Sequence, residues 1–347
     1  MSEPFRLAVV GCGSIAPAWL GPLGDRTDIR IVALVDTVES NARSRAGEFG
    51  LDAPVFTGLE EALSATTPDV VCNLTPPALH HPVTLTALEA GCHVFTEKPL
   101  AAGLDQAAQL IDAADRAGRR LTVMQNRRYM ATIRGLRDAV TGGAIGTPGL
   151  VGIDFFRGPR FGGFRDEMDS PLLLDMAIHT FDAARFITDG RAVAATCTEF
   201  NPPGSWYRGA AAALCTFELE GGLLVSYRGS WAATGLPTSW ESAWRVVGSR
   251  GTAIWEGDST LRCQVEVDAA GFERETREIE ISSSWEGRSG HGGCIDEMLT
   301  ALAEGRPAET DAHDNVHSLA MVLAAVASSS AGGRRIEIAE DGRSISS

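Results

Sequence analysis

The chain has 347 residues, of which 44% are hydrophobic and 22% charged, so it has the composition of a globular protein and the length of two domains. Its formal net charge of −15 argues against a nucleic-acid-binding protein, because phosphate contacts require concentrated lysine and arginine. The sequence has no run of about 18 apolar residues, so we expect no membrane-spanning helix.

The N-terminus and the cysteines favour a cytoplasmic protein. Residues 1–4 lead directly into an apolar segment, without the basic region and cleavage site of a signal peptide. The seven cysteines are scattered and form no C-x-x-C pair, so we expect neither a zinc site nor a disulfide framework. Small buried thiols in a reducing compartment fit this pattern.

Residues 1–125 alternate short apolar segments with helical patterns. Continuous apolar strands with helices between them predict a parallel sheet covered on both faces, wound into an α/β Rossmann domain. The expected strands are 5–10, 29–35, 70–74, 93–96 and 121–123, and the expected helices are 15–23, 40–49, 59–65, 81–90 and 104–117.

Residues 126–347 have a different pattern and predict a second, α+β domain. Several segments alternate in polarity, and Glu220-Gly221-Gly222 is a hairpin signal, so we expect a large, mostly antiparallel, open sheet. The expected strands are 150–156, 192–200, 211–219, 222–231, 242–247, 252–256, 261–267 and 275–281, and the expected helices are 129–140, 172–187, 292–303 and 314–328.

The sequence G-C-G-S-I-A at residues 11–16 follows the first expected strand and opens the first helix. In such a turn the first glycine allows the tight bend, the second lets the backbone approach a pyrophosphate, and the helix N-terminus attracts the phosphate charge. This context predicts dinucleotide binding, with contacts from Gly11, Gly13, Ser14 and Ile15.

Asp36 ends the second expected strand. An acidic residue there hydrogen-bonds the ribose hydroxyls and repels a 2′-phosphate, so it favours NAD over NADP. Arg43 and Arg45 on the next helix could still bind a phosphate, so NADP stays open as the less favoured cofactor.

Two further strand ends carry polar motifs: T-P-P-A-L-H follows strand 70–74 and E-K-P follows strand 93–96. Ligands of open α/β sheets bind outside the carboxyl ends of the strands, so both motifs are expected at the cofactor. The predicted contacts are Thr75, Pro76, His80, Glu97 and Lys98.

The expected helix 172–187 places Asp175, His179 and Asp182 at positions i, i+4 and i+7, on one face. Asp175 is then able to orient the ring of His179 and favour its protonated form. A histidine so placed is suited to passing an alcohol proton while a hydride moves to or from a nicotinamide. A metal site from these three residues is disfavoured, because no fourth ligand is evident.

Together these motifs resemble those of the Gfo/Idh/MocA oxidoreductases, the superfamily of glucose–fructose oxidoreductase and inositol dehydrogenase. The resemblance covers G-C-G-S-I-A, T-P-P-x-x-H, E-K-P, the D-M-A-I-H-T-F-D helix and the tail 314–338. One departure is Ala177, where many members have glycine.

The resemblance implies an NAD(P)-linked interconversion of a hydroxyl and a ketone on a sugar, polyol or sugar acid. It also implies a substrate-binding and oligomerisation role for residues 126–347, in a homodimer or homotetramer built on the open face of the second sheet. By family role Lys98 contacts substrate and nicotinamide, His179 donates or accepts the proton, and Asp175 faces the substrate hydroxyls; these three are the predicted catalytic and substrate-contacting residues.

Further substrate contacts are expected from Asn126 and Arg127, after the last Rossmann strand, and from Arg157. Arg157 belongs to residues 155–165, a segment of arginines, aromatics and glycines that we call the arginine loop. Aromatic faces suit sugars and arginine suits a carboxylate or phosphate. An alternative is that Asp166, Glu167 and Asp169 pair with its three arginines. Trp206 and Tyr207 are candidates for a further aromatic wall.

We therefore predict an NAD(P)-dependent dehydrogenase. Two alternatives stay open: a glycosidase of the same superfamily that uses NAD only transiently, and a non-catalytic sensor that binds NAD and a sugar. The Lys98, Asp175 and His179 set argues against a sensor, which has no need of acid–base chemistry.

Overall fold

The computed structural model describes residues 3–257, 260–268, 272–283 and 285–347. Residues 1 and 2 of the N-terminal segment used above lie outside the described residues. The chain folds into two compact units. Unit 1 comprises Met1–Asn126 and Arg288–Val316, and unit 2 comprises Arg127–Gly287 and His317–Ser347.

Unit 1 contains a six-stranded parallel sheet in the order β3-β2-β1-β4-β5-β6. Its central strands are rich in Val, Ile, Leu and Ala and are buried, as expected for a sheet covered on both faces. The predicted Rossmann fold is thus confirmed. The strands are β1 (Phe5–Val10), β2 (Ile29–Val35), β3 (Val55–Phe56), β4 (Val70–Asn73), β5 (His93–Thr96) and β6 (Leu121–Val123).

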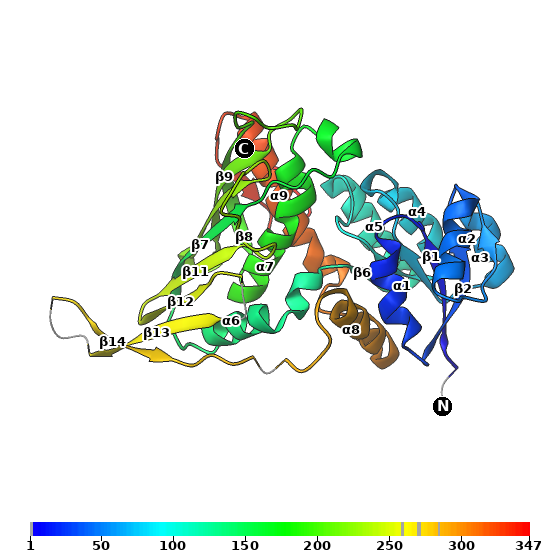
Figure 1. Ribbon diagram of the computed structural model, residues 1–347, viewed down its shortest axis with the longest axis horizontal. Helices are drawn as coiled ribbons and strands as arrows, with labels where there is room; N and C mark the ends of the chain where they lie inside the picture. The colour runs from blue at the N-terminus through cyan, green and yellow to red at the C-terminus, as the bar shows by residue number, and fades with distance from the viewer. Residues whose placement is uncertain (1–2, 258–259, 269–271, 284) are drawn as a thin grey trace. The chain divides into compact units, whose positions relative to one another are not determined.

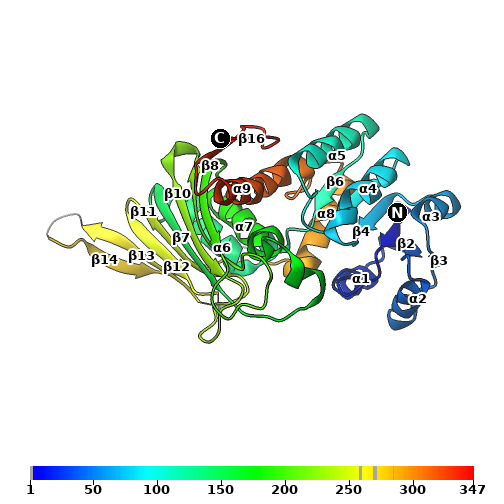
Figure 2. The same ribbon diagram turned by 90° about the horizontal axis from the view of Figure 1, so that it is seen from above.

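The helices of unit 1 cover both faces of this sheet; Figure 2 shows α4 and α5 on one side and α1 on the other. The strand order reverses beside β1, so the loops after β1 and β4 meet at the switch point where ligands of such sheets bind. The helices are α1 (Ala16–Gly24), α2 (Glu39–Glu48), α3 (Leu59–Thr66), α4 (Pro77–Glu89), α5 (Leu104–Ala117) and α8 (Gly290–Glu304).

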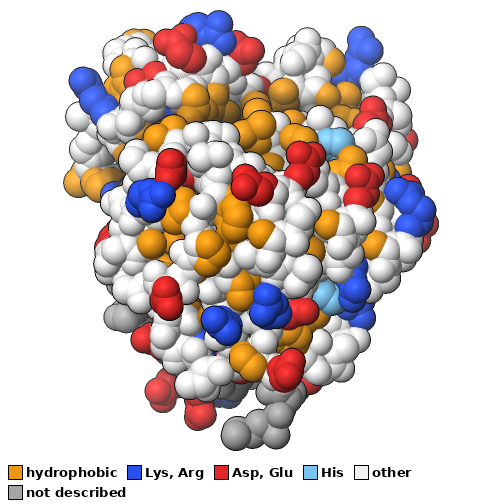
Figure 3. Space-filling view, turned by 90° about the vertical axis from the view of Figure 1, so that its right-hand side faces the viewer, with side chains coloured by type: hydrophobic (Ala, Val, Ile, Leu, Met, Phe, Trp, Pro, Cys, Tyr) orange, Lys and Arg blue, Asp and Glu red, His pale blue; other side chains and the backbone are white. Residues whose placement is uncertain are grey.

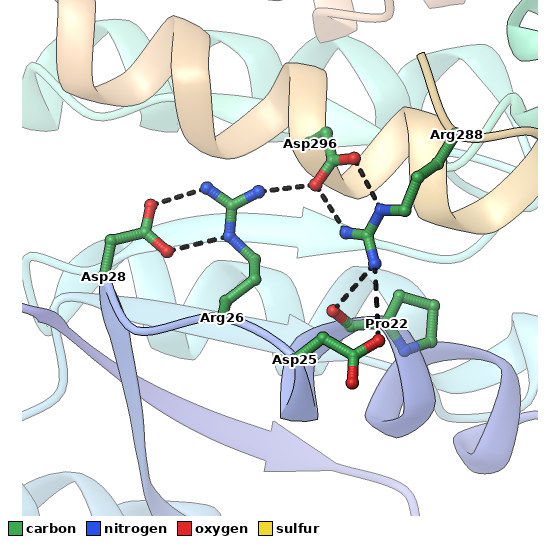
Figure 4. A network of polar contacts seen from close by, with 6 residues as sticks. All are labelled: Pro22, Asp25, Arg26, Asp28, Arg288 and Asp296. Carbon is green, nitrogen blue, oxygen red and sulfur yellow. Dashed lines mark hydrogen bonds and ion pairs between the residues drawn. The ribbon is translucent and has the colours of Figure 1, made fainter.

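Helix α8 belongs to unit 1, although residues 126–347 were expected to form one continuous domain. Asp296 on α8 accepts hydrogen bonds from Arg288 and from Arg26, which follows α1, and Arg288 Nη1 donates to Pro22 O at 3.2 Å (Figure 4). These ion pairs, together with the packing of α8 on α1, hold residues 288–316 against the Rossmann sheet. Single-sequence patterns do not report such a return of the chain.

Unit 2 contains a ten-stranded sheet in the order β14-β13-β12-β11-β7-β10-β9-β8-β15-β16. Every described pair is antiparallel except β7 with β10, so the predicted large, mostly antiparallel sheet is confirmed. Its strands are β7 (Pro148–Phe156), β8 (Ala192–Phe200), β9 (Ala212–Leu219), β10 (Leu224–Ser230), β11 (Ala243–Gly248), β12 (Gly251–Trp255), β13 (Leu261–Asp268), β14 (Glu275–Ile279), β15 (Ile336–Ile338) and β16 (Ile345–Ser346).

The helices of unit 2 lie on one face of its sheet, as Figures 1 and 2 show for α6 (Ala131–Thr141), α7 (Ile178–Thr188) and α9 (Ala312–Ser330). The α7 face carries an apolar core in which Phe181 packs edge-on against Phe217 and Tyr227. The predicted helix 172–187 begins with a π-helical segment, Leu172–Ala177, and becomes α-helical at Ile178.

Among the described residues, no helix is long and apolar enough to cross a membrane. On the face of the molecule in Figure 3, acidic and basic side chains are interspersed and the basic ones form no continuous patch. That face therefore lacks the continuous basic patch that binds the phosphates of a nucleic acid.

Candidate functional site

The glycine turn after β1 has the geometry that its motif predicts. Gly11 has φ +95°, and a Cβ there would lie 2.7 Å from Leu74 C and O, so only glycine fits. A Cβ at Gly13 would have no neighbouring atom within 4 Å, so the backbone is open to a ligand at that point. Ser14 and Ile15 then lead into α1 at Ala16. The turn thus fits a pyrophosphate beside a helix N-terminus.

The carboxylate of Asp36 is held beside this turn. It accepts hydrogen bonds from the backbone N–H of Cys12 at 2.9 Å and of Val38 at 2.8 Å, and from Asn41 Nδ2 at 3.3 Å. Burial, together with the nearby charge of Asp36, raises the pKa of the Cys12 thiol to about 11. Asp36 is therefore fixed at the end of β2, where the adenosine ribose of a dinucleotide lies in this fold.

Arg43 and Arg45, the two candidates for a 2′-phosphate, already have partners. Arg43 pairs with Glu39. Arg45 donates to Cys12 O at 3.3 Å and to Gly13 O at 3.1 Å, and it pairs with Glu48. Arg45 thus binds two carbonyl oxygens of the glycine turn.

The turn after β4 is fixed by His80 and Asn73. His80 is fully buried; its Nδ1 lies 2.6 Å from Pro99 O and its Nε2 2.8 Å from Thr75 O. Burial lowers the pKa of His80. Asn73 accepts from Thr75 Oγ1 at 2.6 Å. His80 thus joins two loops at the switch point, and its ring nitrogens contact protein carbonyls.

Glu97 forms a second buried contact set in unit 1. Its Oε1 accepts from Trp19 Nε1 at 2.7 Å and lies 3.7 Å from His291 Nε2, and His291 Nδ1 lies 3.2 Å from Asn126 Nδ2. Burial raises the pKa of Glu97, but the contacts with His291 and Trp19 outweigh this and the pKa is lowered overall. The backbone N–H of Lys98 also donates to Glu97, at 3.2 Å.

Glu97 therefore positions the loop that carries Lys98, which is half-buried and precedes a cis peptide bond to Pro99. Trp19 and His291 were missed by sequence reasoning. Trp19 looked like an ordinary apolar helix residue, and His291 lies in the segment that returns to unit 1. No pattern in the sequence marks either residue as a partner of Glu97.

In unit 2, Asp175 lies in the π-helical segment and is buried, and His179, in the first turn of α7, is half-buried. Arg165 Nε donates to Asp175 Oδ2 at 2.6 Å, which favours the charged carboxylate. This arginine, from the arginine loop, was not expected as the partner of Asp175.

The expected grouping of Asp182 with Asp175 and His179 is wrong for the Asp182 carboxylate. Asp182 is 1% exposed; it accepts two hydrogen bonds from Arg128, at 2.7 and 2.6 Å, and one from Ser318 at 2.7 Å. It therefore joins α7 to η1 (Asn126–Tyr129) and α9 within the core. Its partners Arg128 and Ser318 come from segments far along the chain, which helical spacing does not reveal.

Arg127 is a buried cation of unit 2. Burial lowers its pKa to about 10, against the opposing influence of Glu241 and Tyr227. Its Nη1 and the hydroxyl of Tyr227 have no hydrogen-bond partner among the described residues. Buried polar groups are normally satisfied, so these two atoms are exceptions within unit 2.

The arginine loop is not neutralised by the acids beside it. Arg208, outside the loop, donates to Glu167 O and to Asp169 Oδ1 at 2.8 Å. Within the described residues, the loop arginine that forms an ion pair is Arg165, with Asp175. The alternative pairing of all three arginines with these acids is therefore wrong.

Trp206 and Tyr207 do form part of an aromatic group. The Tyr207 ring lies 5.3 Å from Trp206 and is stacked on Trp231 at 5.8 Å. The described residues contain no group of three His, Cys, Asp or Glu side chains that could hold a metal ion.

Two family models match this chain. One, for the NAD-binding Rossmann fold of the GFO/IDH/MocA oxidoreductase family, matches residues 5–125, and one for the GFO/IDH/MocA C-terminal domain matches residues 133–254. The chain belongs to the Gfo/Idh/MocA oxidoreductase family. The resemblance inferred from the motifs is thereby confirmed.

Relatives of this Gfo/Idh/MocA chain include dehydrogenases and reductases of sugars. It is 33% identical to the D-glucoside 3-dehydrogenase of Escherichia coli over 54% of each chain. It is 32% identical to the 1,5-anhydro-D-fructose reductase of Ensifer adhaerens over 52% of this chain and 56% of that one. These two matches thus span about half the length of each relative.

The fold of the whole chain is that of solved family structures. An oxidoreductase from Agrobacterium radiobacter, in complex with NAD⁺, L-tartaric acid and magnesium, superimposes with a TM-score of 0.84. It is 22% identical, and the match covers 96% of this chain and 98% of that one.

Proposed function

We propose that this Gfo/Idh/MocA chain is an NAD-dependent dehydrogenase that interconverts a hydroxyl and a ketone on a sugar, polyol or sugar acid. The observation that carries the proposal is the set Lys98, Asp175 and His179, which lies in the E-K-P and D-M-A-I-H-T-F-D motifs by which the chain resembles this family. Two relatives named as a glucoside dehydrogenase and an anhydrofructose reductase support the substrate class and the reversible chemistry.

The residues that would hold the cofactor are those of the switch point. Gly11 allows the tight turn and Gly13 leaves the backbone open to the pyrophosphate, with Ser14 and Ile15 at the helix N-terminus, and Asp36 would face the ribose hydroxyls. Thr75 and Pro76 belong to the turn that His80 fixes, so His80 acts as a positioning residue. When bound, NAD would accept the hydride from the carbinol carbon or return it.

NAD is the proposed cofactor rather than NADP. The fixed negative charge of Asp36 repels a 2′-phosphate. Arg43 and Arg45 would have to leave Glu39, Glu48 and the turn carbonyls to bind one.

In the proposed reaction His179 takes the hydroxyl proton as the carbinol carbon loses its hydride, and returns it in the reverse direction. The Lys98 ammonium donates to the same oxygen and stabilises the negative charge that develops there. Asp175, held by the hydrogen bond from Arg165, accepts hydrogen bonds from substrate hydroxyls. Asn126 and Arg127 are proposed to bind further substrate oxygens, because they follow the carboxyl end of β6, the side of the sheet at which ligands bind in this fold.

Replacement of the two proton-handling residues tests the proposal. We expect His179→Ala and Lys98→Ala each to lower kcat by about 10²- to 10⁴-fold, because each removes a group that acts on the reacting oxygen. NADH binding, followed by fluorescence titration, should stay within about twofold of wild type. As a control, His81→Ala removes a histidine whose Nε2 contacts Gln109 on the surface and should leave kcat unchanged. Wild-type kcat in both test variants would refute the assignment.

We also propose that the chain forms a homo-oligomer through the sheet face of unit 2 that its helices do not cover. Outward-facing apolar side chains gather there on β7, β9 and β10: Leu150 is 42% exposed, Leu214 50% and Leu224 41%. Leu150 and Leu224 are direct partners in the sheet. An exposed apolar face of this kind favours association with a second copy.

A further inference from the structure

The arginine loop, residues 155–165, lies within a connected group of aromatic rings in unit 2. The Phe161 ring is 5.7 Å from Trp231 and 6.2 Å from Trp240. The guanidinium of Arg165, which binds Asp175, lies 5.2 Å from the Phe161 ring. Arg165 therefore links this aromatic group to Asp175, the proposed catalytic carboxylate. Phe161 is 52% exposed and Trp240 36%, so the aromatic group is open to solvent.

Arg157 is a fixed cation at one end of this group. Its backbone N–H donates to Ser230 O at 2.9 Å, and its carbonyl accepts from Ala233 at 3.1 Å. Its Nη1 donates to Thr238 O at 2.7 Å, and its guanidinium lies 4.3 Å above the Trp240 ring. Stacking and one hydrogen bond thus hold the guanidinium plane and leave its other N–H groups for a ligand.

Arg160 is a second cation at the other end. Its guanidinium lies 4.7 Å above the Trp206 ring, and Trp206 is in contact with Tyr207. Within the described residues, neither Arg157 nor Arg160 forms a hydrogen bond or ion pair with a carboxylate. Two cations without a counter-charge are unusual in a chain whose formal net charge is −15.

Four acids lie near this group: Asp166, Glu167, Asp169 and Asp175. Asp175 is paired with Arg165, and Arg208 contacts Glu167 and Asp169. Asp166 lies close enough to act on Tyr207: burial is the larger effect, and with Asp166 it raises the pKa of Tyr207 to about 12. These four acids equal in number the arginines Arg157, Arg160, Arg165 and Arg208, but within the described residues none of them forms an ion pair with Arg157 or Arg160.

From this arrangement we propose that the substrate carries an oxyanionic group, a carboxylate or a phosphoryl group, and that Arg157 and Arg160 bind it. The proposal rests on the proposed function and names its substrate class: an acidic sugar derivative rather than a neutral sugar. A planar guanidinium matches both oxyanions in a bidentate geometry. The neighbouring Phe161 and Trp240 rings suit the C–H face of the sugar or the base of a nucleotide sugar.

The test compares charged and neutral members of matched pairs. The pairs are methyl glucuronide with methyl glucoside for a carboxylate, glucose 6-phosphate with glucose for a phosphate ester, and UDP-N-acetylglucosamine with N-acetylglucosamine for a diphosphate. With NAD as cofactor, we expect the wild type to have the higher kcat/KM for the charged member of at least one pair. The pair concerned identifies the oxyanion.

Arg157→Gln should then lower kcat/KM for the charged member by about tenfold or more, since a hydrogen bond to a charged group is lost. Arg160→Gln should lower it by about threefold, because that arginine is exposed and screened. The neutral member should stay within about twofold. Arg157→Lys, which keeps the charge, should retain part of the preference. The matched control is Arg208→Gln. It removes the same charge from an arginine that is already paired with Glu167 and Asp169.

A preference for the neutral member in every pair would overturn the inference, as would an equal loss for both members or an equal effect of Arg208→Gln. Melting temperatures of all variants separate these outcomes from misfolding. If no probe is turned over, the proposed function fails instead. Calorimetric binding of the same pairs to the NAD-loaded chain then tests the arginines separately: tighter binding of a charged member, lost in Arg157→Gln, supports them, and its absence overturns them.

Discussion

At the scale of single residues, the chemistry depends on how charged side chains are held. Glu97 and Asp175 are both buried carboxylates, and each has donors: Trp19 and His291 lower the pKa of Glu97, and Arg165 donates to Asp175. Asp36 is held by backbone N–H groups of the turn beside it. A carboxylate fixed in this way needs no reorganisation when a ligand binds.

Asp36→Asn tests the proposed choice of cofactor. The substitution keeps the size of the side chain but removes the charge and weakens its acceptor capacity. We expect the KM for NAD to rise by about tenfold and the KM for NADP to fall, since a charged hydrogen bond to the ribose is lost and the repulsion of a 2′-phosphate is relieved. Steady-state kinetics with both cofactors measures the ratio. The control is Asp52→Asn, at an exposed acid of the same unit. If Asp36→Asn leaves the ratio of the KM values for NAD and NADP unchanged, Asp36 does not determine the cofactor preference.

Sequence motifs predicted the residues at strand ends but not their partners. Gly11, Gly13 and Asp36 were predictable because a local turn dictates their geometry. His291 and Arg165 were not, because each meets its partner through a loop whose path no local pattern specifies.

At the scale of elements, periodicity predicted most strands and helices of both sheets. It could not predict the two-residue strands β3 and β16, which are too short to show a pattern. It also missed the π-helical start of the segment before α7. The grouping of Asp182 with Asp175 and His179 was wrong because Asp182 is bound by Arg128 and Ser318, from distant segments.

The contacts that hold residues 288–316 in unit 1 include a histidine, so part of the stability of the fold depends on pH. His313 Nδ1 lies 2.8 Å from Asp311 Oδ1, and its Nε2 lies 3.2 Å from Asp115 Oδ2 on α5. Burial lowers the pKa of His313, but the two carboxylates outweigh it and raise the pKa above 6.5. The contacts therefore stabilise the fold below pH 6.5, and this stabilisation is lost as the pH rises through the folded pKa.

His313→Asn should accordingly lower the melting temperature by about 1–2 °C at pH 6, equivalent to roughly 0.5 kcal/mol for an exposed pair, and by less at pH 9. Scanning fluorimetry at the two pH values measures the difference. The surface variant His81→Asn should show no such change between them. A larger effect of His313→Asn at pH 9 than at pH 6 would contradict the sign of this linkage.

At the scale of the whole molecule, the sheet of unit 2 has a helix-covered face and an open one, and the open face bears on assembly. On β9 the exposed Leu214 alternates with the buried Cys215 and Phe217, so one strand serves both a core and a surface. The sequence predicted this alternation. It could not predict that Leu150 on β7 lies beside Leu224 on β10, because that depends on the order of the strands in the sheet.

Leu214→Glu combined with Leu224→Glu should convert the proposed oligomer to a monomer, because two charges would be buried in an apolar interface. Light scattering after size-exclusion chromatography gives the mass directly. Leu236→Glu, at a leucine outside the sheet that is 99% exposed, should leave the assembly intact. A monomeric wild type, or a double variant of unchanged mass, would reject this interface.

The most direct test of the central proposal is a screen of sugars, inositols, sugar acids and their phosphates with NAD, in which NADH absorbance and ketone product are measured together. We predict equal amounts of NADH and ketone from a productive substrate, in the wild type and not in His179→Ala. Release of a sugar from a glycoside without net NADH would instead identify a glycosidase. Binding of NAD and sugar without turnover would identify a sensor, and either result would contradict the proposed dehydrogenase.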